Sequence, residues 1–171
     1  VLSTGTTGGT GAASAGVFAE QGAELMLGAR RRDEGEAVAT AVRDAGGKAV
    51  FMPLDVTDPE QVEAIVARTV ETYGKLDCLF NNAGGSSTKD GKVTQIDYEV
   101  YWDTIRLNLF GTFLMSRFAI PEIAKQGGGS VINNASYMGL QGLGNDAYSA
   151  SKGGVLAMTR SMSVQFAADR I

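Results

Sequence analysis

The sequence contains no histidine and only one cysteine, Cys78. Without imidazole, the usual serine and cysteine triads are excluded, and a single thiol leaves a zinc site short of its preferred ligands, so we expect no metal site. Cys78 has no disulfide partner within the chain, and its place in the apolar run of residues 76–80 predicts a buried small hydrophobe rather than a catalytic thiol. Acid–base chemistry in this chain must therefore use Tyr, Lys, Asp or Glu.

Long apolar runs and an excess of positive charge are also missing. No run approaches the ~20 apolar residues that cross a bilayer, and the amino end does not form a basic-then-apolar signal pattern. The formal net charge is −4, and the only dense basic cluster is Arg30-Arg31-Arg32, which argues against a general nucleic-acid binder. We therefore expect a cytoplasmic protein that acts on a small molecule, with neither nucleic acid nor membrane as a partner.

What the sequence does contain is the composition of one globular domain, with 44% hydrophobic and 20% charged residues in a chain of 171. Apolar runs alternate with helical stretches. The expected strands are residues 1–4, 25–27, 49–52, 76–80 and 130–135, and the expected helices are residues 12–21, 34–45, a stretch from residue 59, 97–126 and 145–170. Three aspartates are predicted to cap helices, namely Asp33, Asp58 and Asp97. The alternation predicts a single domain over residues 1–171, a doubly wound Rossmann-type α/β fold with a parallel sheet and helices on both faces.

A glycine-rich turn joins the first expected strand to the first expected helix. Its sequence is Gly5-Thr6-Thr7-Gly8-Gly9-Thr10-Gly11. Glycines at such a place let the backbone approach a pyrophosphate, and the amides and dipole of the following helix hold its charge. The same stretch is compatible with a plain turn, because its spacing differs from the commoner Gly-x-Gly-x-x-Gly.

The second expected strand leads into the basic cluster. An NAD site usually has an acidic residue near the end of that strand to bind the adenosine ribose. Here Arg30 begins the cluster instead, and a guanidinium suits a 2′-phosphate, which favours NADP over NAD. The alternative interpretation is a solvated basic stretch at the start of the next helix.

Two further stretches carry amide side chains. Asn81-Asn82-Ala83-Gly84-Gly85 follows the fourth expected strand, where it fits either a ligand crevice or an asparagine–glycine turn. The polar residues 86–92 are expected to form a mobile loop over the site. Asn108 lies inside an apolar helical series, which indicates either a satisfied core amide or a polar group aimed at a site.

Tyr148 and Lys152 are the strongest indication of chemistry. Residues four apart share one face of a helix, so the ammonium lies near the phenol and favours its ionised form. Ser136, twelve residues upstream, supplies a hydroxyl that can hold a substrate oxygen during proton exchange. A simple contact on a helix surface is the alternative interpretation of the Tyr–Lys pair.

Taken together, these motifs resemble the short-chain dehydrogenase/reductase family over essentially the whole chain. The matching motifs are Thr4-Gly5-x-x-x-Gly9-x-Gly11, Asp55-Val56, Asn81-Asn82-Ala83-Gly84, Asn108, Ser136 and Tyr148-x-x-x-Lys152. The resemblance implies that Tyr148 is the general acid/base, that Ser136 orients the substrate oxygen, and that Lys152 favours the phenolate and binds the nicotinamide ribose. It also implies that Asn108 completes a proton relay through water.

The resemblance extends to the cofactor site. It implies binding by Gly5, Thr7, Gly9, Thr10, Gly11, Arg30, Asp55, Val56, Asn82, Ala83, Tyr148 and Lys152. Within this set, Asp55 is similar to the adenine contact and Arg30 to the 2′-phosphate contact of NADP-preferring members. Two positions depart from the family pattern, because Thr10 replaces an aliphatic residue and Gly8 stands where many of those members place a second basic residue.

The function implied is hydride transfer between NADP(H), with NAD as the alternative coenzyme, and a secondary alcohol or ketone. The alternative is a non-catalytic nucleotide-binding or scaffold protein that retained the fold. Because the family usually continues beyond the position of Ile171, and the first strand is short and has no initiating methionine, we expect the chain to be incomplete at both ends and to lack its C-terminal strands. The apolar residues in 109–115 and 155–162 exceed what one sheet face needs, so we also expect a homodimer or homotetramer.

Overall fold

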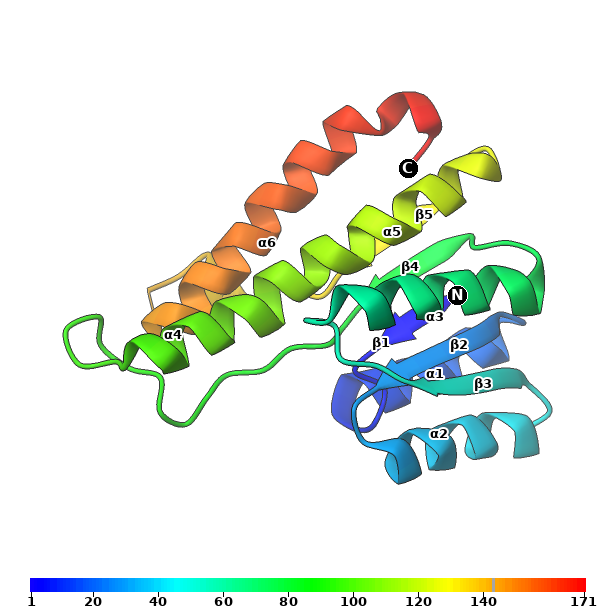
Figure 1. Cartoon of the computed structure of the whole chain (residues 1–171), viewed down its shortest axis with the longest axis horizontal. Helices are drawn as coiled ribbons and strands as arrows, with labels where there is room; N and C mark the ends of the chain where they lie inside the picture. Colours follow the sequence, from blue (N-terminus) through cyan, green and yellow to red (C-terminus); the bar gives the residue numbers. More distant parts are fainter. Residues whose placement is uncertain (143) are drawn as a thin grey trace.

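A computed structural model describes residues 1–142 and 144–171, and within them five parallel strands form one sheet in the order β3-β2-β1-β4-β5 (Figure 1). The strands are β1 Leu2–Thr4, β2 Glu24–Ala29, β3 Lys48–Pro53, β4 Cys78–Asn81 and β5 Ser130–Asn133. The α-helices are α1 Gly9–Glu20, α2 Arg32–Asp44, α3 Pro59–Tyr73, α4 Tyr98–Ile105, α5 Gly111–Lys125 and α6 Asp146–Gln165. A π-helical turn, η1 Arg106–Phe110, joins α4 to α5, and short 3₁₀ turns lie at η2 Tyr137–Gly139 and η3 Ala167–Asp169.

Helices cover both faces of the sheet because successive strand residues point to opposite sides. Within β2, Leu25 and Leu27 pack with residues of α1 and α2, whereas Met26 packs with residues of α3 and α5. Helix α6 packs on α4 beyond the β4–β5 half of the sheet (Figure 1). The predicted doubly wound Rossmann-type fold is confirmed.

The strand order places β1 at the centre, with β2 on one side and β4 on the other. The chain builds outward from β1 to β3 and then returns to the other side to add β4 and β5. Such a reversal leaves a crevice at the carboxyl ends of the two central strands, where ligands bind in folds of this class. The glycine turn after β1 and the asparagines of β4 therefore meet at one edge.

The predicted helix caps had different outcomes. The Asp58 carboxylate accepts hydrogen bonds from the amides of Glu60 (3.0 Å) and Gln61 (3.3 Å) at the start of α3, as predicted. The prediction for Asp33 was wrong, because α2 already begins at Arg32 and Asp33 lies in its first turn. Asp97 occupies the N-cap position of α4, but its side chain makes no capping bond.

Helix α2 lies close against β3 at Gly35. A Cβ on Gly35 would collide with the ring of Phe51 on β3, so the helix rests directly on the strand at this glycine. A carboxylate in the first turn, such as that of Asp33, still interacts favourably with the helix dipole.

Residues 97–126 are helical almost throughout, as predicted, with the π-turn η1 inserted at Asn108. Two large apolar residues of this stretch lie on the outside, since Trp102 is 53% and Phe113 is 43% exposed. Cys78 is only half-buried, and burial raises the pKa of its thiol. No helix in residues 1–142 or 144–171 has the length and apolarity needed to cross a bilayer.

Candidate active site

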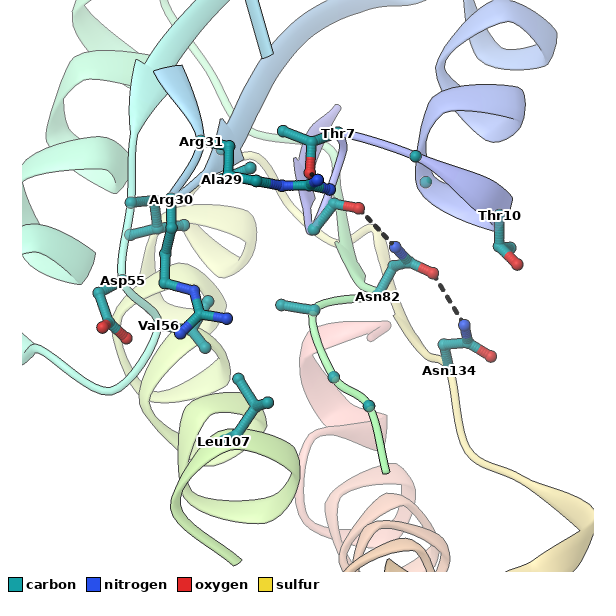
Figure 2. A pocket seen from close by; sticks show the side chains of 18 of the residues that line it. Thr7, Thr10, Ala29, Arg30, Arg31, Asp55, Val56, Asn82, Leu107 and Asn134 are labelled. Atoms are coloured by element: carbon teal, nitrogen blue, oxygen red, sulfur yellow. Dashed lines mark hydrogen bonds between the residues drawn. The ribbon is translucent and has the colours of Figure 1, made fainter. Parts of the chain in front are cut away.

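A cavity of about 750 Å³ opens at the carboxyl ends of the strands (Figure 2). It collects residues from the glycine turn, the ends of β2 and β4, the segments after β3 and β5, and helix α6. The predicted cofactor residues that line it are Gly5, Thr7, Thr10, Gly11, Arg30, Asp55, Val56, Asn82, Ala83, Tyr148 and Lys152. Of that predicted set, Gly9 alone is not among the lining residues.

The glycine turn brings the start of α1 against the end of β4. A Cβ on Gly11 would collide with the carbonyl of Gly5 and would lie 2.7 Å from Nδ2 of Asn82. Gly5 has a φ of +67°, and a Cβ there would lie 2.7 Å from Cα of Ala83. The bare backbone leaves the N-terminus of α1 open to the cavity, which is the cradle that a pyrophosphate requires.

Asn82 ties this turn to the neighbouring strands. Its Nδ2 donates to the carbonyl oxygens of Thr4 and Gly5, both at 3.1 Å. Its Oδ1 accepts from Nδ2 of Asn134 at 2.8 Å (Figure 2). The hydroxyl of Thr4 accepts from the amides of Asn82 (3.1 Å) and Ala83 (3.0 Å). Asn82 is thus a cross-link between strand ends rather than part of a plain turn.

The sequence interpretation did not single out Asn134, although it also lines the cavity. Its position follows the carboxyl end of β5, the same position that Asn82 has after β4. The reasoning applied to the fourth strand would therefore have found it. Asn134 contributes at two points, because its side chain holds Asn82 and its carbonyl accepts from Lys152 Nζ at 2.7 Å.

Two arginines line the cavity at the end of β2. Figure 2 shows Arg30 beside Asp55 and Val56, and Arg31 beside Thr7. Nη2 of Arg31 donates to the Thr7 hydroxyl at 2.8 Å, while its Nη1 pairs with Glu34 at 2.6 Å.

Arg31 occupies the space beside Gly8, because a Cβ built on that glycine would lie 3.9 Å from the Arg31 guanidinium. Gly8 is the position at which the family resemblance would place a second basic residue. In this chain Arg31, at the start of α2, places its guanidinium beside Gly8 instead. The sequence interpretation took Arg30 from the basic cluster and missed Arg31, although the run of three arginines was the available signal.

Tyr148 and Lys152 lie one helical turn apart on α6, and both line the cavity. Nζ of Lys152 is 5.8 Å from the centroid of the Tyr148 ring, so the predicted proximity of ammonium and phenol is present. Lys152 is only 4% exposed, and burial lowers the pKa of its ammonium below the ordinary 10.5.

Asn108 and Ser136 lie outside the cavity lining. Asn108 is fully buried in the π-turn, where its Nδ2 donates to the carbonyl oxygens of Gly85 and Thr104 and its Oδ1 accepts from the Gly85 amide, each at 2.9 Å. It holds the backbone of a lining residue, and π-turns are frequent at functional sites. Oγ of Ser136 accepts from the Met138 amide at 3.2 Å, so that Ser136 is the N-cap of η2.

The buried ammonium predicts a pH dependence of stability. Between the lowered pKa of folded Lys152 and 10.5, the unfolded chain holds more protons at this residue than the folded chain does. The contribution of Lys152 to the free energy of unfolding therefore rises with pH in that window. A Lys152→Met variant lacks this contribution, so its stability relative to wild type should be highest near neutral pH and fall as pH approaches 10.5.

Urea denaturation of both proteins from about pH 7 to about pH 10 measures this difference. Groups that titrate identically in the two proteins cancel in the comparison. A relative stability that stayed constant, or that rose with pH, would contradict burial as the dominant influence on Lys152.

Comparison with known proteins relates this geometry to a family. Residues 1–171 match the family described as short chain dehydrogenase. An uncharacterized oxidoreductase of Thermotoga maritima is 37% identical over 167 residues, which cover 97% of this chain and 65% of that protein. The cis-4-hydroxycyclohexanecarboxylate dehydrogenase of Sinomonas cyclohexanicum is 37% identical over 171 residues, which cover 98% of this chain and 67% of that protein.

A solved structure gives the same result in three dimensions. A crystal structure of a variant of actinorhodin polyketide ketoreductase with NADPH has a TM-score of 0.91 and 31% identity, covering 97% of this chain and 65% of that one. The chain thus spans about two thirds of the length of these relatives. Because the match to the family extends over every residue, and relatives above 30% identity align along nearly its full length, the chain belongs to the short-chain dehydrogenase family.

Proposed function

We propose that this chain forms the coenzyme and acid–base site of an NADP(H)-dependent oxidoreductase that interconverts a secondary alcohol and a ketone. The observation that carries the proposal is the composition of one cavity. A pyrophosphate cradle at Gly5 and Gly11, two arginines, and the Tyr148–Lys152 pair all line it. A non-catalytic nucleotide-binding protein would need the first of these features but has no use for the Tyr–Lys pair.

In this proposal the bound coenzyme supplies the hydride for reduction and accepts it in oxidation. The phenol of Tyr148 gives its proton to the carbonyl oxygen of a ketone, or takes the proton of an alcohol in the reverse direction. Nζ of Lys152 lies 5.8 Å from the centroid of the Tyr148 ring, and its bond to the Asn134 carbonyl keeps it there. Ser136 orients the substrate oxygen, and Asn108 takes part in the proton relay through water.

Arginine at the end of β2 supports NADP as the preferred coenzyme. Guanidinium groups bind phosphate through directed, charge-assisted hydrogen bonds. Arg30 lines the cavity beside Asp55, the proposed adenine contact, and Arg31 extends the positive charge towards the glycine turn. The ketoreductase relative was crystallised with NADPH, which is consistent with this preference.

The direct test is a fluorescence titration of the full-length protein with NADPH and NADH, followed by a panel of ketones and secondary alcohols. We expect tighter binding of NADPH and coenzyme-dependent turnover of at least one panel member. Coenzyme binding with no turnover across the panel would instead indicate a nucleotide-binding protein without catalysis. Absence of binding to either coenzyme would refute the proposal.

We also propose that a second copy of the chain packs against α5 and α6. An apolar groove lies between these helices, lined by Phe113, Ile120, Met158, Met162 and Phe166 among others. Phe113 is 43% exposed and stacks on Phe110 with ring centroids 6.1 Å apart. Met158 and Met162 of the same groove are half-buried. Accessible aromatic and methionine side chains of this kind are typical of interfaces.

Light scattering on the full-length protein measures this self-association. We expect a dimer or tetramer for the wild type and a shift towards monomer for Phe113→Asp. Val17→Asp is the matched control, since it places the same charge on an exposed apolar position of α1, outside the groove. A wild-type monomer at micromolar concentration, or equal dissociation by both variants, would contradict the proposed interface.

A further inference from the structure

The segment that follows β4 is bonded both to the π-turn that carries Asn108 and to α6, which carries Tyr148 and Lys152. At one end, the backbone of Gly85 forms two hydrogen bonds with the side chain of Asn108 in the π-turn. A few residues later, Asp90, Gly91 and Val93 bond to the start of α6. Gly85 also lines the cavity, so this segment runs from the cavity edge to the N-terminus of the helix that bears Tyr148.

The start of α6 is not capped by its own N-cap side chain. That residue, Asn145, has a left-handed backbone with φ of 53° and makes no capping bond. The carboxylate of Asp90 takes its place from 58 residues away, accepting from the amides of Ala147 (3.2 Å) and Tyr148 (2.8 Å). A carboxylate at this end also interacts favourably with the dipole of a helix of 20 residues.

Further bonds fix the same junction. The amide of Asp146 donates to the carbonyl of Gly91 at 3.1 Å, and its carboxylate accepts from the Val93 amide at 2.7 Å. The amide of Gly91 donates back to Asp90 at 2.8 Å, which holds the carboxylate in the orientation that reaches α6. The loop and the first turn of the helix therefore form one hydrogen-bonded unit.

The bond to the Tyr148 amide has a consequence for the phenol. Residue 148 is attached at its backbone to Asp90, and one turn later Lys152 is attached through Nζ to the Asn134 carbonyl. These two attachments hold the helix face that lines the cavity at two points one turn apart. A proton-transfer group must be held at hydrogen-bonding distance from its target, and displacement by about 1 Å can cost on the order of a hundredfold in rate.

We propose that Asp90 is a positioning residue for Tyr148, acting through the backbone amides of the first turn of α6. This inference rests on the proposed function in assigning proton transfer to Tyr148. The proposed role requires a side chain with two acceptor oxygens, one for each of the two amides. Asp90→Ala removes both acceptors, whereas Asp90→Asn keeps one carbonyl oxygen and replaces the other with a donor that cannot accept from an amide.

Asp58 provides the matched control, because it caps α3 through two backbone amides in the same way and does not line the cavity. The alanine variants of Asp90 and Asp58 should each lower Tm by about 2–4 °C through loss of a cap. At saturating coenzyme, we expect Asp90→Ala to lower kcat on the order of ten- to a hundredfold while Kd for NADPH stays within about twofold. Asp90→Asn should give an intermediate kcat, and Asp58→Ala should stay within about twofold of wild type.

Amide hydrogen exchange supplies a measurement that does not depend on turnover. In Asp90→Ala, exchange at the amides of Ala147 and Tyr148 should accelerate by roughly tenfold or more relative to wild type, and Asp58→Ala should leave these two amides unchanged. Exchange unaffected by Asp90→Ala would overturn the inference. So would a kcat within about twofold of wild type, or an equal fall in kcat for Asp58→Ala.

The two measurements separate failure of this inference from failure of the proposed function. If the wild type turns over no alcohol or ketone, the proposed function is refuted, and so is the catalytic role of Asp90. Accelerated exchange in that case would still establish the attachment of α6 through Asp90. Turnover by the wild type together with normal turnover by Asp90→Ala would refute the positioning role alone.

Discussion

Tyr148→Phe is expected to lower kcat on the order of 10²–10⁴-fold, which is the contribution that a positioned general acid or base makes. The substitution removes only the hydroxyl that exchanges the proton. The ring remains beside Lys152, and the glycine turn and both arginines are untouched. Kd for NADPH should therefore stay within about twofold, so that the loss appears in turnover rather than in binding. Steady-state kinetics with the best substrate of the panel, together with a fluorescence titration, measure the two quantities.

Tyr73→Phe is a suitable control for this experiment. The hydroxyl of Tyr73 donates to the Leu25 carbonyl at 2.8 Å, outside the cavity lining, so its removal should cost about 1 kcal/mol of stability. We expect its kcat to match that of wild type. Turnover by Tyr148→Phe at the wild-type rate would refute the assignment of this residue as the acid/base, whatever the effect on stability.

The double variant Arg30→Ala/Arg31→Ala is expected to weaken NADPH binding on the order of 100-fold or more, because each charge-assisted hydrogen bond to phosphate contributes about 1.5–3 kcal/mol. NADH has no 2′-phosphate, so its Kd should change little. The coenzyme preference of the protein should thus fall or reverse. Titrations with both coenzymes at two ionic strengths would also show a weaker salt dependence for the variant.

Arg32→Ala is the matched control for charge, since Arg32 is the exposed neighbour in the same basic run and does not line the cavity. It should leave the preference for NADPH intact. The single variants Arg30→Ala and Arg31→Ala measure how much each arginine contributes to the affinity for NADPH. Arg31→Ala also removes the bond to Thr7. An equal loss of affinity for NADPH and NADH would show that these arginines stabilise the binding site but do not recognise the 2′-phosphate.

Much of the fold could be predicted because its signals are local. Strand and helix stretches differ in hydrophobic period, and the Asp58-Pro59 start of α3 follows a cap rule that involves only neighbouring residues. The strand-end positions of Gly5 and Asn82 could also be predicted, because parallel strands bring their carboxyl ends to the same edge. The match to the short-chain dehydrogenase family confirms the resemblance on which the remaining expectations depended.

The features that sequence reasoning missed depend on contacts between distant residues. The cap on α6 comes from Asp90, and no pattern near Asn145 indicates it. The Arg31 side chain lies beside Gly8, where it bonds to Thr7 and pairs with Glu34, and the bond to Thr7 spans 24 residues. The wrong cap at Asp33 came from placing the start of α2 at residue 34, whereas the helix begins at Arg32.

The catalytic roles of Ser136 and Asn108 stay predictions. Asn108 is placed by three bonds to backbone groups, which explains how an amide is accommodated among apolar neighbours without deciding what it does in a reaction. Ser136 begins a 3₁₀ turn at the end of the segment that follows β5. A hydroxyl there is within the same part of the fold as Tyr148, and its function awaits a variant such as Ser136→Ala.

The cross-link made by Asn82 bears on how the protein acquires its ligand site. Asn82 joins Thr4, 78 residues earlier, to Asn134, 52 residues later, so pieces of the cradle are separated by most of the chain. Contacts of such long range form late and slowly, because the entropy cost of closing the intervening loops precedes the stabilisation that the contacts provide. Nucleotide added during refolding would then bind only molecules in which these three segments have come together. The rise in melting temperature that the nucleotide causes would therefore measure how much of the protein has formed the complete site.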